Sequence, residues 1–431
     1  MGEALVLLRS ERPYRRLLSA SLISGVGDWF NSVTLLSLLL HLTGSGLAVG
    51  LSLAARTLPY LVVGPIAGSL ADRFNRKTIL VVSDFARAGV ALSFLFVQSA
   101  SDVWVAYAGT VLLIVFSAFF SPARTAVIPQ LVEPKHLLQA NSLEQATFGL
   151  VMALGSALGG VVIATFGTDT AFLINSASFL ISGLMILFIP IPSHRADRGA
   201  PSGSESHSSN PSNPASGTFR ATPSFWAVFR QSRLVQVMAL QALLWPIGGG
   251  VINVLLSIYG YQTFHGGNTG VGVLYGALGL GFLISGFMIR HVKAWLRQAA
   301  VIGFLLEGMC HVFVSQSGNL WTASILLVVA TIGAGVGNAA VTSLLMQAVP
   351  IEVHGRVFAL FDTISSVILA GSMMAAGVLL NHLAARTLGL GSGLLLVMAS
   401  AVTGALFLRL KLPSPTIPAP RGSWNETLSR D

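Results

Sequence analysis

Apolar segments long enough to cross a lipid bilayer recur along almost the whole of this chain. A transmembrane helix needs about 20 consecutive, mostly apolar residues to span the hydrocarbon core. The composition agrees, because 53% of the 431 residues are hydrophobic and only 10% are charged. Soluble domains carry about 25% charged residues. We therefore expect an all-α membrane protein with many transmembrane helices.

Twelve segments have the length and hydropathy of transmembrane helices. We place them at residues 17–40, 46–71, 78–99, 103–121, 139–165, 170–192, 235–261, 270–290, 298–315, 320–347, 356–381 and 389–410. Short turns such as His41–Ser45 and Phe166–Asp169 join successive spans on one side. Turns this short require neighbouring spans to run antiparallel.

Lysine and arginine are distributed unevenly between the two sides of these spans. We assign 22 of the 25 basic residues to loops and termini on one side, whereas Arg386 alone falls in a loop on the other; Arg56 and Arg87 lie within spans. Cytoplasmic loops carry an excess of Lys and Arg. This asymmetry predicts that both termini and the central loop are cytoplasmic.

A polar segment divides the chain into two parts. Residues 193–230 are rich in Ser, Pro, Gly and Asn, which predicts a flexible cytoplasmic linker between six-helix halves at 1–192 and 231–412, with a tail at 413–431. A shift of 217 residues aligns 121–160 with 338–377, with identities that include Thr125/Thr342 and Gln130/Gln347. This weak match favours a parallel repeat with a cavity between the halves.

The turn after the second span carries the most specific pattern. Gly68, Asp72, Arg73, Arg76 and Lys77 stand in the sequence Gly-Ser-Leu-Ala-Asp-Arg-Phe-Asn-Arg-Lys. This pattern resembles the loop between helices 2 and 3 of the major facilitator superfamily of transporters. We expect the glycine to allow close helix packing, and the aspartate to form a gating contact that breaks during transport. The alternative is that the three bases only set topology.

Further stretches resemble the exporter branch of this superfamily that includes enterobactin and macrolide efflux proteins. They are Ser121–Val132, Leu138–Leu143 and His354–Thr363. The resemblance implies export from the cytoplasm of a bacterial cell across its inner membrane. Gly155–Gly160 also resembles the antiporter motif of the fifth helix, although Ser156 stands where a proline is usual. Ordinary small-residue helix packing is the alternative reading of that stretch.

Charged residues within the spans are candidates for ion coupling and gating, because a charge in a bilayer is costly. Asp28 and Arg56 have comparable predicted depths, so they either form an ion pair or leave Asp28 to carry a proton. Glu307 and His311 lie one helical turn apart, as either a proton relay or a satisfied hydrogen-bonded pair. The remaining charged candidates are assigned to gates or anchors near the inner ends of spans: Asp84, Arg87, Glu144 and Asp362.

Polar and aromatic residues inside apolar runs are candidates for binding the substrate. Spans 1, 4, 7 and 10 line the cavity in the superfamily, so the resemblance makes their polar residues candidates, together with the charged Arg56. They are Trp29, Asn31, Arg56, Gln241, Trp245, Asn253 and Asn338. For any one of these residues, the alternative is packing or a hydrogen bond between helices.

The sequence lacks the usual signs of an enzyme or a cofactor site. It has no Walker-type phosphate loop and no His-Glu-x-x-His motif. The single cysteine, Cys310, allows no internal disulfide. We expect a monomeric, proton-coupled exporter of a small amphiphilic solute, with no cofactor and no nucleic-acid partner. The alternatives are a lysophospholipid transporter of the same fold, and a membrane scaffold or sensor that does not transport.

Overall fold

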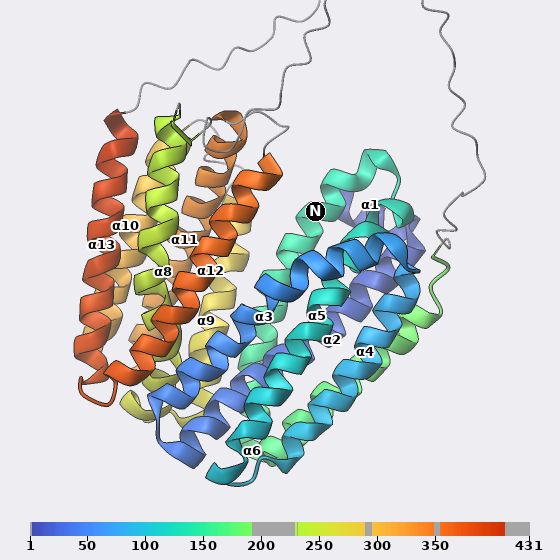
Figure 1. Ribbon diagram of the computed structural model, residues 1–431, viewed down its shortest axis with the longest axis horizontal. Coiled ribbons are helices and arrows are strands. Elements are labelled where there is room, and N and C mark those ends of the chain that lie inside the picture. Colours follow the sequence, from blue (N-terminus) through green and yellow to red (C-terminus); the bar gives the residue numbers. More distant parts are fainter. Residues whose placement is uncertain (1, 192–228, 231, 289–294, 349–353, 410–431) are drawn as a thin grey trace, which may run out of the picture.

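The computed structural model describes residues 2–191, 229–230, 232–288, 295–348 and 354–409 (Figure 1). Within these ranges every regular element is a helix. Eleven helices in the same ranges are long and apolar enough to cross a membrane. The predicted all-α membrane architecture is therefore confirmed.

The helices follow one another in two groups. The first comprises α1 Gly2–Ser10, α2 Arg12–Thr43, α3 Gly46–Arg73, α4 Arg76–Ser93, α5 Val103–Leu131 and α6 Leu137–Leu187. The second comprises α8 Arg233–Ile258, α9 Gly267–Met288, α10 Leu296–Gln316, α11 Leu320–Ala348, α12 His354–Leu379 and α13 Ala385–Arg409. Short 3-10 turns cover Phe94–Phe96, Ala100–Asp102 and Pro134–His136, and a π-helical turn, η4, covers Tyr259–Thr263.

Ten predicted spans correspond to single helices, and the remaining two lie together in α6. Gly167 interrupts α6 with a φ of 84° and a ψ of 172°, a backbone conformation that strongly favours glycine. The predicted turn at 166–169 is therefore present. The predicted linker at 193–230 lies outside the described residues except for Phe229 and Arg230, and so does the tail. The division into two halves stays a prediction at its boundaries.

Local sequence sets where the first helices end. Gly44 closes α2 in the left-handed conformation, and its N–H donates to the carbonyl of Leu40. Ser45 then caps α3 by accepting from the N–H of Leu47. In the basic turn, the Asn75 side chain caps α4 by accepting from the N–H of Lys77 at 2.9 Å. These caps make both turns short.

Among the described residues, the apolar cluster that the two groups share lies toward one end of the molecule. We call the end where α2 begins the N-terminal side and the end with the turn at 44–45 the far side (Figure 1). One apolar cluster joins the groups toward the far side: it includes Phe30, Leu36, Leu40, Val49, Leu255, Leu256, Tyr259, Val271, Leu274 and Met373. On the N-terminal side each group has its own cluster, one around Tyr14, Leu17 and Ile128 and one around Leu234, Leu344 and Val357.

Glycines bring helices of the two groups into backbone contact. A Cβ atom on Gly377 of α12 would lie 2.6 Å from the Cα of Leu47 of α3. A Cβ atom on Gly160 of α6 would lie 2.9 Å from the Cα of Gly272 of α9. The pairs α3–α12 and α6–α9 are therefore the closest seams between the groups. Figure 1 shows the two groups converging toward the far side and splaying apart toward the N-terminal side.

Candidate functional site

A buried carboxyl group lies within the second group of helices. Glu307 of α10 is 5% exposed, and its side chain accepts from the indole N–H of Trp245 of α8 at 3.1 and 3.2 Å to its two oxygens. Trp245 is only half-buried. Because it precedes Pro246, it lies where the helix loses a backbone hydrogen bond. One side chain thus connects a buried acid to a more exposed part of α8.

His311 lies one turn beyond Glu307 on α10 and is also buried, at 7% exposed. Residues four apart on a helix have Cβ atoms about 6 Å from each other. Glu307 and His311 therefore share one face of α10, as their spacing predicts. No hydrogen bond joins their side chains in the described residues, so the satisfied pair is not formed in this conformation. The proton-relay role stays a prediction.

Asp28 and Arg56 in the first group are both half-buried. No ion pair joins them in the part of the chain that the structure describes. Both charges lie close enough to the Tyr60 hydroxyl to interact with it electrostatically. Trp29, next to Asp28, reaches across to Tyr275 of α9, with ring centroids 6.1 Å apart. Among the described residues, Asp28 therefore has no ion-pair partner, and its neighbour Trp29 contacts the other group.

Asp84 and Arg87 form a buried ion pair inside the first group. Asp84 also accepts from the Ser182 hydroxyl of α6 at 2.7 Å. The Arg87 guanidinium lies 4.2 Å from the ring centroid of Phe120 in α5 and 4.5 Å from that of Phe179 in α6. The pair thus joins three helices of one group. This geometry is that of an anchor, whereas gating by the pair stays a prediction.

Glu144 takes part in a network on the N-terminal side. It forms an ion pair with Arg124 of α5 and accepts from the Tyr14 hydroxyl of α2 at 3.2 Å. Arg124 also donates to the hydroxyl of Ser21 at 2.7 Å. Sequence reasoning assigned Arg124 to a loop and missed this role, because the fourth predicted span ended at residue 121 whereas α5 continues to Leu131.

The repeat does not reproduce this network in the second group. With the shift of 217, the positions of Arg124 and Glu144 correspond to Val341 and Phe361, which pack in the apolar cluster of the N-terminal side. Asp362 is exposed on α12 and makes no ion pair within the described residues. The predicted gates at Glu144 and Asp362 therefore have different surroundings.

The basic turn at 68–77 is only partly as expected. The close packing predicted at Gly68 is not formed, because a Cβ atom there would meet nothing within 4 Å. Arg73 is exposed, Lys77 is half-buried, and Arg76 donates to the carbonyl of Ala126 in α5 at 3.1 Å. The side chain of Asp72 lies outside the described residues, so its gating contact stays a prediction.

The candidate substrate-binding residues do not gather at one place. Asn31 is 1% exposed, and Gln241 is buried and accepts from the Thr403 hydroxyl of α13 at 2.9 Å. The Asn253 amide donates to the carbonyl of Gly249 within α8 at 2.8 Å. Asn338 is exposed on α11. Trp29 and Trp245 are half-buried and pack against the apolar cluster that joins the two groups.

Comparison with known proteins places this geometry in a family. The family model described as Major Facilitator Superfamily matches residues 17–371. The uncharacterized MFS-type transporter YfiS of Bacillus subtilis is 34% identical over 185 residues, which is 43% of this chain and 44% of that protein. The match therefore spans less than half the length of this relative.

Two further likenesses extend over most of the chain. Macrolide efflux protein A of Streptococcus pyogenes is 23% identical over 382 residues, covering 87% of this chain and 88% of that protein. The crystal structure of an auto-inhibited POT family peptide transporter superposes with a TM-score of 0.70 at 12% identity, over 95% of this chain and 99% of that one. The likeness to that structure shows the fold alone. From the family model, and from the eleven membrane-length helices among the described residues, the chain belongs to the major facilitator superfamily, whose members are membrane transporters and not enzymes.

Proposed function

We propose that this transporter exports a small amphiphilic solute, of the macrolide or siderophore kind, and that an inward flow of protons drives export. The observation that carries the proposal is Glu307, a buried carboxyl whose hydrogen-bond partner, Trp245, is half-buried. A carboxyl that moves between apolar and wet surroundings binds and releases a proton as it moves. The efflux protein among the relatives supports export.

The arrangement of the cores supports transport by alternating access. The far-side cluster joins the two groups, whereas the N-terminal side has a separate cluster in each group. We place the N-terminal side in the cytoplasm because the basic loops lie there. The conformation is then an inward-facing state of the transport cycle. A buried acid is energetically costly, and a scaffold or sensor that does not transport has no use for one, which disfavours that alternative.

Asp28 is the second candidate for carrying the coupling proton. It is half-buried and has no cationic partner among the described residues. Its place beside Trp29, which contacts Tyr275 of the other group, puts it at the junction that must change between states. Arg56 is then free to contact an anionic part of the substrate. One measurement of proton flux tests Asp28 and Glu307 together.

The test is proton flux in vesicles that contain the purified protein and a pH-sensitive dye. Erythromycin, a lipophilic cationic dye and a catecholate siderophore are added in turn to wild type, Asp28→Asn and Glu307→Gln. We expect at least one compound to drive a pH change in wild type, and Glu307→Gln to abolish it. If no compound moves protons, the proposal fails. Transport of a lysophospholipid in the same vesicles would then replace it.

A further inference from the structure

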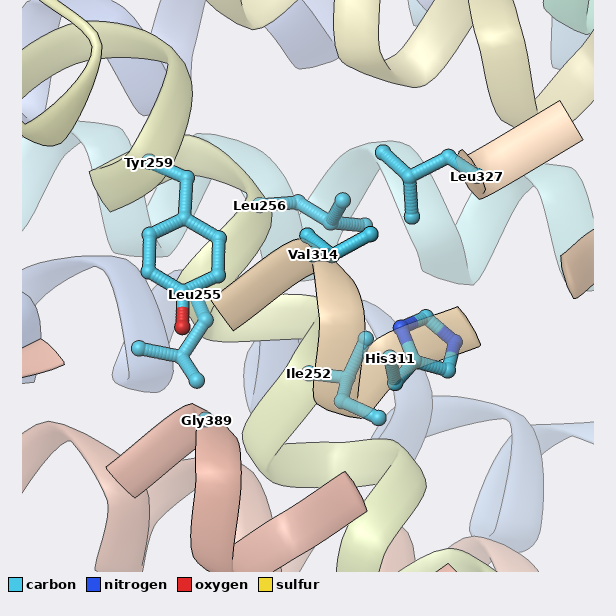
Figure 2. A pocket seen from close by; sticks show the side chains of 8 residues that line it. All are labelled: Ile252, Leu255, Leu256, Tyr259, His311, Val314, Leu327 and Gly389. Carbon is cyan, nitrogen blue, oxygen red and sulfur yellow. The ribbon is translucent and has the colours of Figure 1, made fainter. Parts of the chain in front are cut away.

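A small cavity lies on the far side of the buried acid. Figure 2 shows His311 and Tyr259 among the residues that line it, with Val314 of α10 and Gly389 of α13 close by. The other lining residues are aliphatic side chains of α8 and α11. The space is large enough for about one water molecule. The cavity therefore adjoins a buried imidazole.

The order of residues along the helices places this cavity between Glu307 and the far side. Helix α10 begins on the N-terminal side at Leu296 and ends on the far side at Gln316. His311 is thus one turn closer to the far side than Glu307. Tyr259 starts the π-helical turn at the end of α8, and its hydroxyl donates to the carbonyl of Ala385, the first residue of α13.

Most of the residues that line the cavity are aliphatic, and His311 and Tyr259 are the two titratable ones. The cavity is available space beside the His311 ring. That ring makes no hydrogen bond to another side chain or carbonyl in the described residues. Most buried polar groups are hydrogen-bonded. An imidazole with neither a partner nor close packing on one side has room to turn.

We propose that His311 carries protons between the far side and Glu307, and that the cavity is the space in which its ring turns. This inference rests on the proposed function of Glu307. Neutral His311 accepts a proton from water entering past Tyr259, and the imidazolium then passes that proton to the Glu307 carboxylate. The neutral carboxyl later releases it toward the N-terminal side, when the hydrogen bond from the half-buried Trp245 changes.

The groups around this path fit a proton carrier. Cys310, next to His311 in sequence, is buried and interacts electrostatically with Glu307. Arg386 is exposed and interacts electrostatically with the Tyr259 hydroxyl. In the described part of the chain, no ion pair involves a residue that lines the cavity. Proton transfer through His311 therefore does not compete with a permanent ion pair.

The test reads the protonation of Glu307 directly and does not need a transported substrate. Infrared difference spectra are recorded after a rapid acidification of protein in lipid, and the band of a neutral carboxyl is assigned to Glu307 by its loss in Glu307→Gln. We expect His311→Gln and Val314→Leu to slow the rise of this band at least about tenfold, because a positioned proton donor is removed or its space is filled. Val402→Leu makes the same change at an exposed position of α13 that does not line the cavity, and is expected to retain the wild-type rate.

Thermal unfolding of each variant shows that it is folded. Wild-type rates in both His311→Gln and Val314→Leu overturn the inference, as does the absence of a Glu307 band in wild type. If Val314→Leu fails to fold, His311→Gln alone decides. A slowed band together with no drug-driven proton flux would support the relay while refuting the proposed export function.

Discussion

At the scale of single residues, the buried carboxyl of Glu307 accepts hydrogen bonds from a neutral donor, the indole N–H of Trp245. A buried polar group is costly when its partner is removed, because the group loses both water and its replacement. The indole of Trp245 contacts both carboxyl oxygens, so it stabilises the carboxyl in its buried position. The sequence predicted both residues as functional candidates but could not show that they meet, since 62 positions separate them.

Replacing Trp245 by Phe tests this contact. The variant keeps an aromatic ring and loses the N–H donor, so we expect it to lower the free energy of unfolding by about 1–3 kcal/mol. The same change at Trp104, which is 68% exposed on α5, is the matched control and should cost less than about 0.5 kcal/mol. Chemical unfolding in detergent micelles measures both. Equal costs for the two variants would contradict the structural role of the Trp245–Glu307 bond.

At the scale of helices, the buried pair of Asp84 and Arg87 joins α4 to α5 and α6. The two residues are three apart in sequence, which places them on one face of α4. The contacts of Asp84 with Ser182, and of Arg87 with Phe120 and Phe179, come from packing between helices. Hydropathy could not predict them, because it measures how apolar a segment is and not which face it turns to a neighbour.

Arg87→Met should destabilise the first group of helices strongly. It leaves the carboxylate of Asp84 buried without its counterion, which costs about 3–5 kcal/mol. The double variant Asp84→Asn with Arg87→Met removes that charge and should recover a large part of the loss. The measurement is the free energy of unfolding of the single and double variants. A double variant no more stable than Arg87→Met would show that the lost cation–π packing, and not the unpaired charge, dominates.

The helix ends show a second limit at this scale. The predicted fourth span stops at residue 121, before Pro122 and Arg124, but α5 continues to Leu131. A proline removes one backbone hydrogen bond but does not always end a helix. A transmembrane helix can also extend beyond the hydrocarbon core of the bilayer. The sequence therefore predicted where α5 begins and missed the extension that places Arg124 beside Glu144.

At the scale of the whole molecule, α3 and α12 are in close backbone contact on the far side. A Cβ atom on Gly50 would overlap the carbonyl oxygen of Met373, whereas one on Gly64 of the same helix would meet nothing within 4 Å. His41 and the hydroxyl of Tyr261 also lie 3.2 Å apart across the two groups. Backbone contact of this kind tolerates no added side chain.

Gly50→Val should therefore shift the protein toward a conformation that is open on the far side. Spin labels at Ser99 and His382, both exposed there, report the separation of the groups in a Cys310→Ala background. We expect a longer distance distribution in Gly50→Val and an unchanged one in Gly64→Val. An unchanged distribution in both variants would mean that the α3–α12 contact does not control closure.

Hydropathy and residue type were enough to predict the membrane class and the segments that form its helices, because both follow from local sequence, but they missed the part of α5 that carries Arg124. Tertiary structure alone decided which charges have partners: Asp84 with Arg87 and Glu144 with Arg124, whereas Asp28 and Arg56 form no ion pair. It also decided that the core is shared on the far side and divided on the N-terminal side. The position of a span depends on the free energy of moving that segment from water to lipid, which is a local property. The partner of a charged side chain, and the conformation of the whole molecule, depend on how helix faces far apart in sequence pack together.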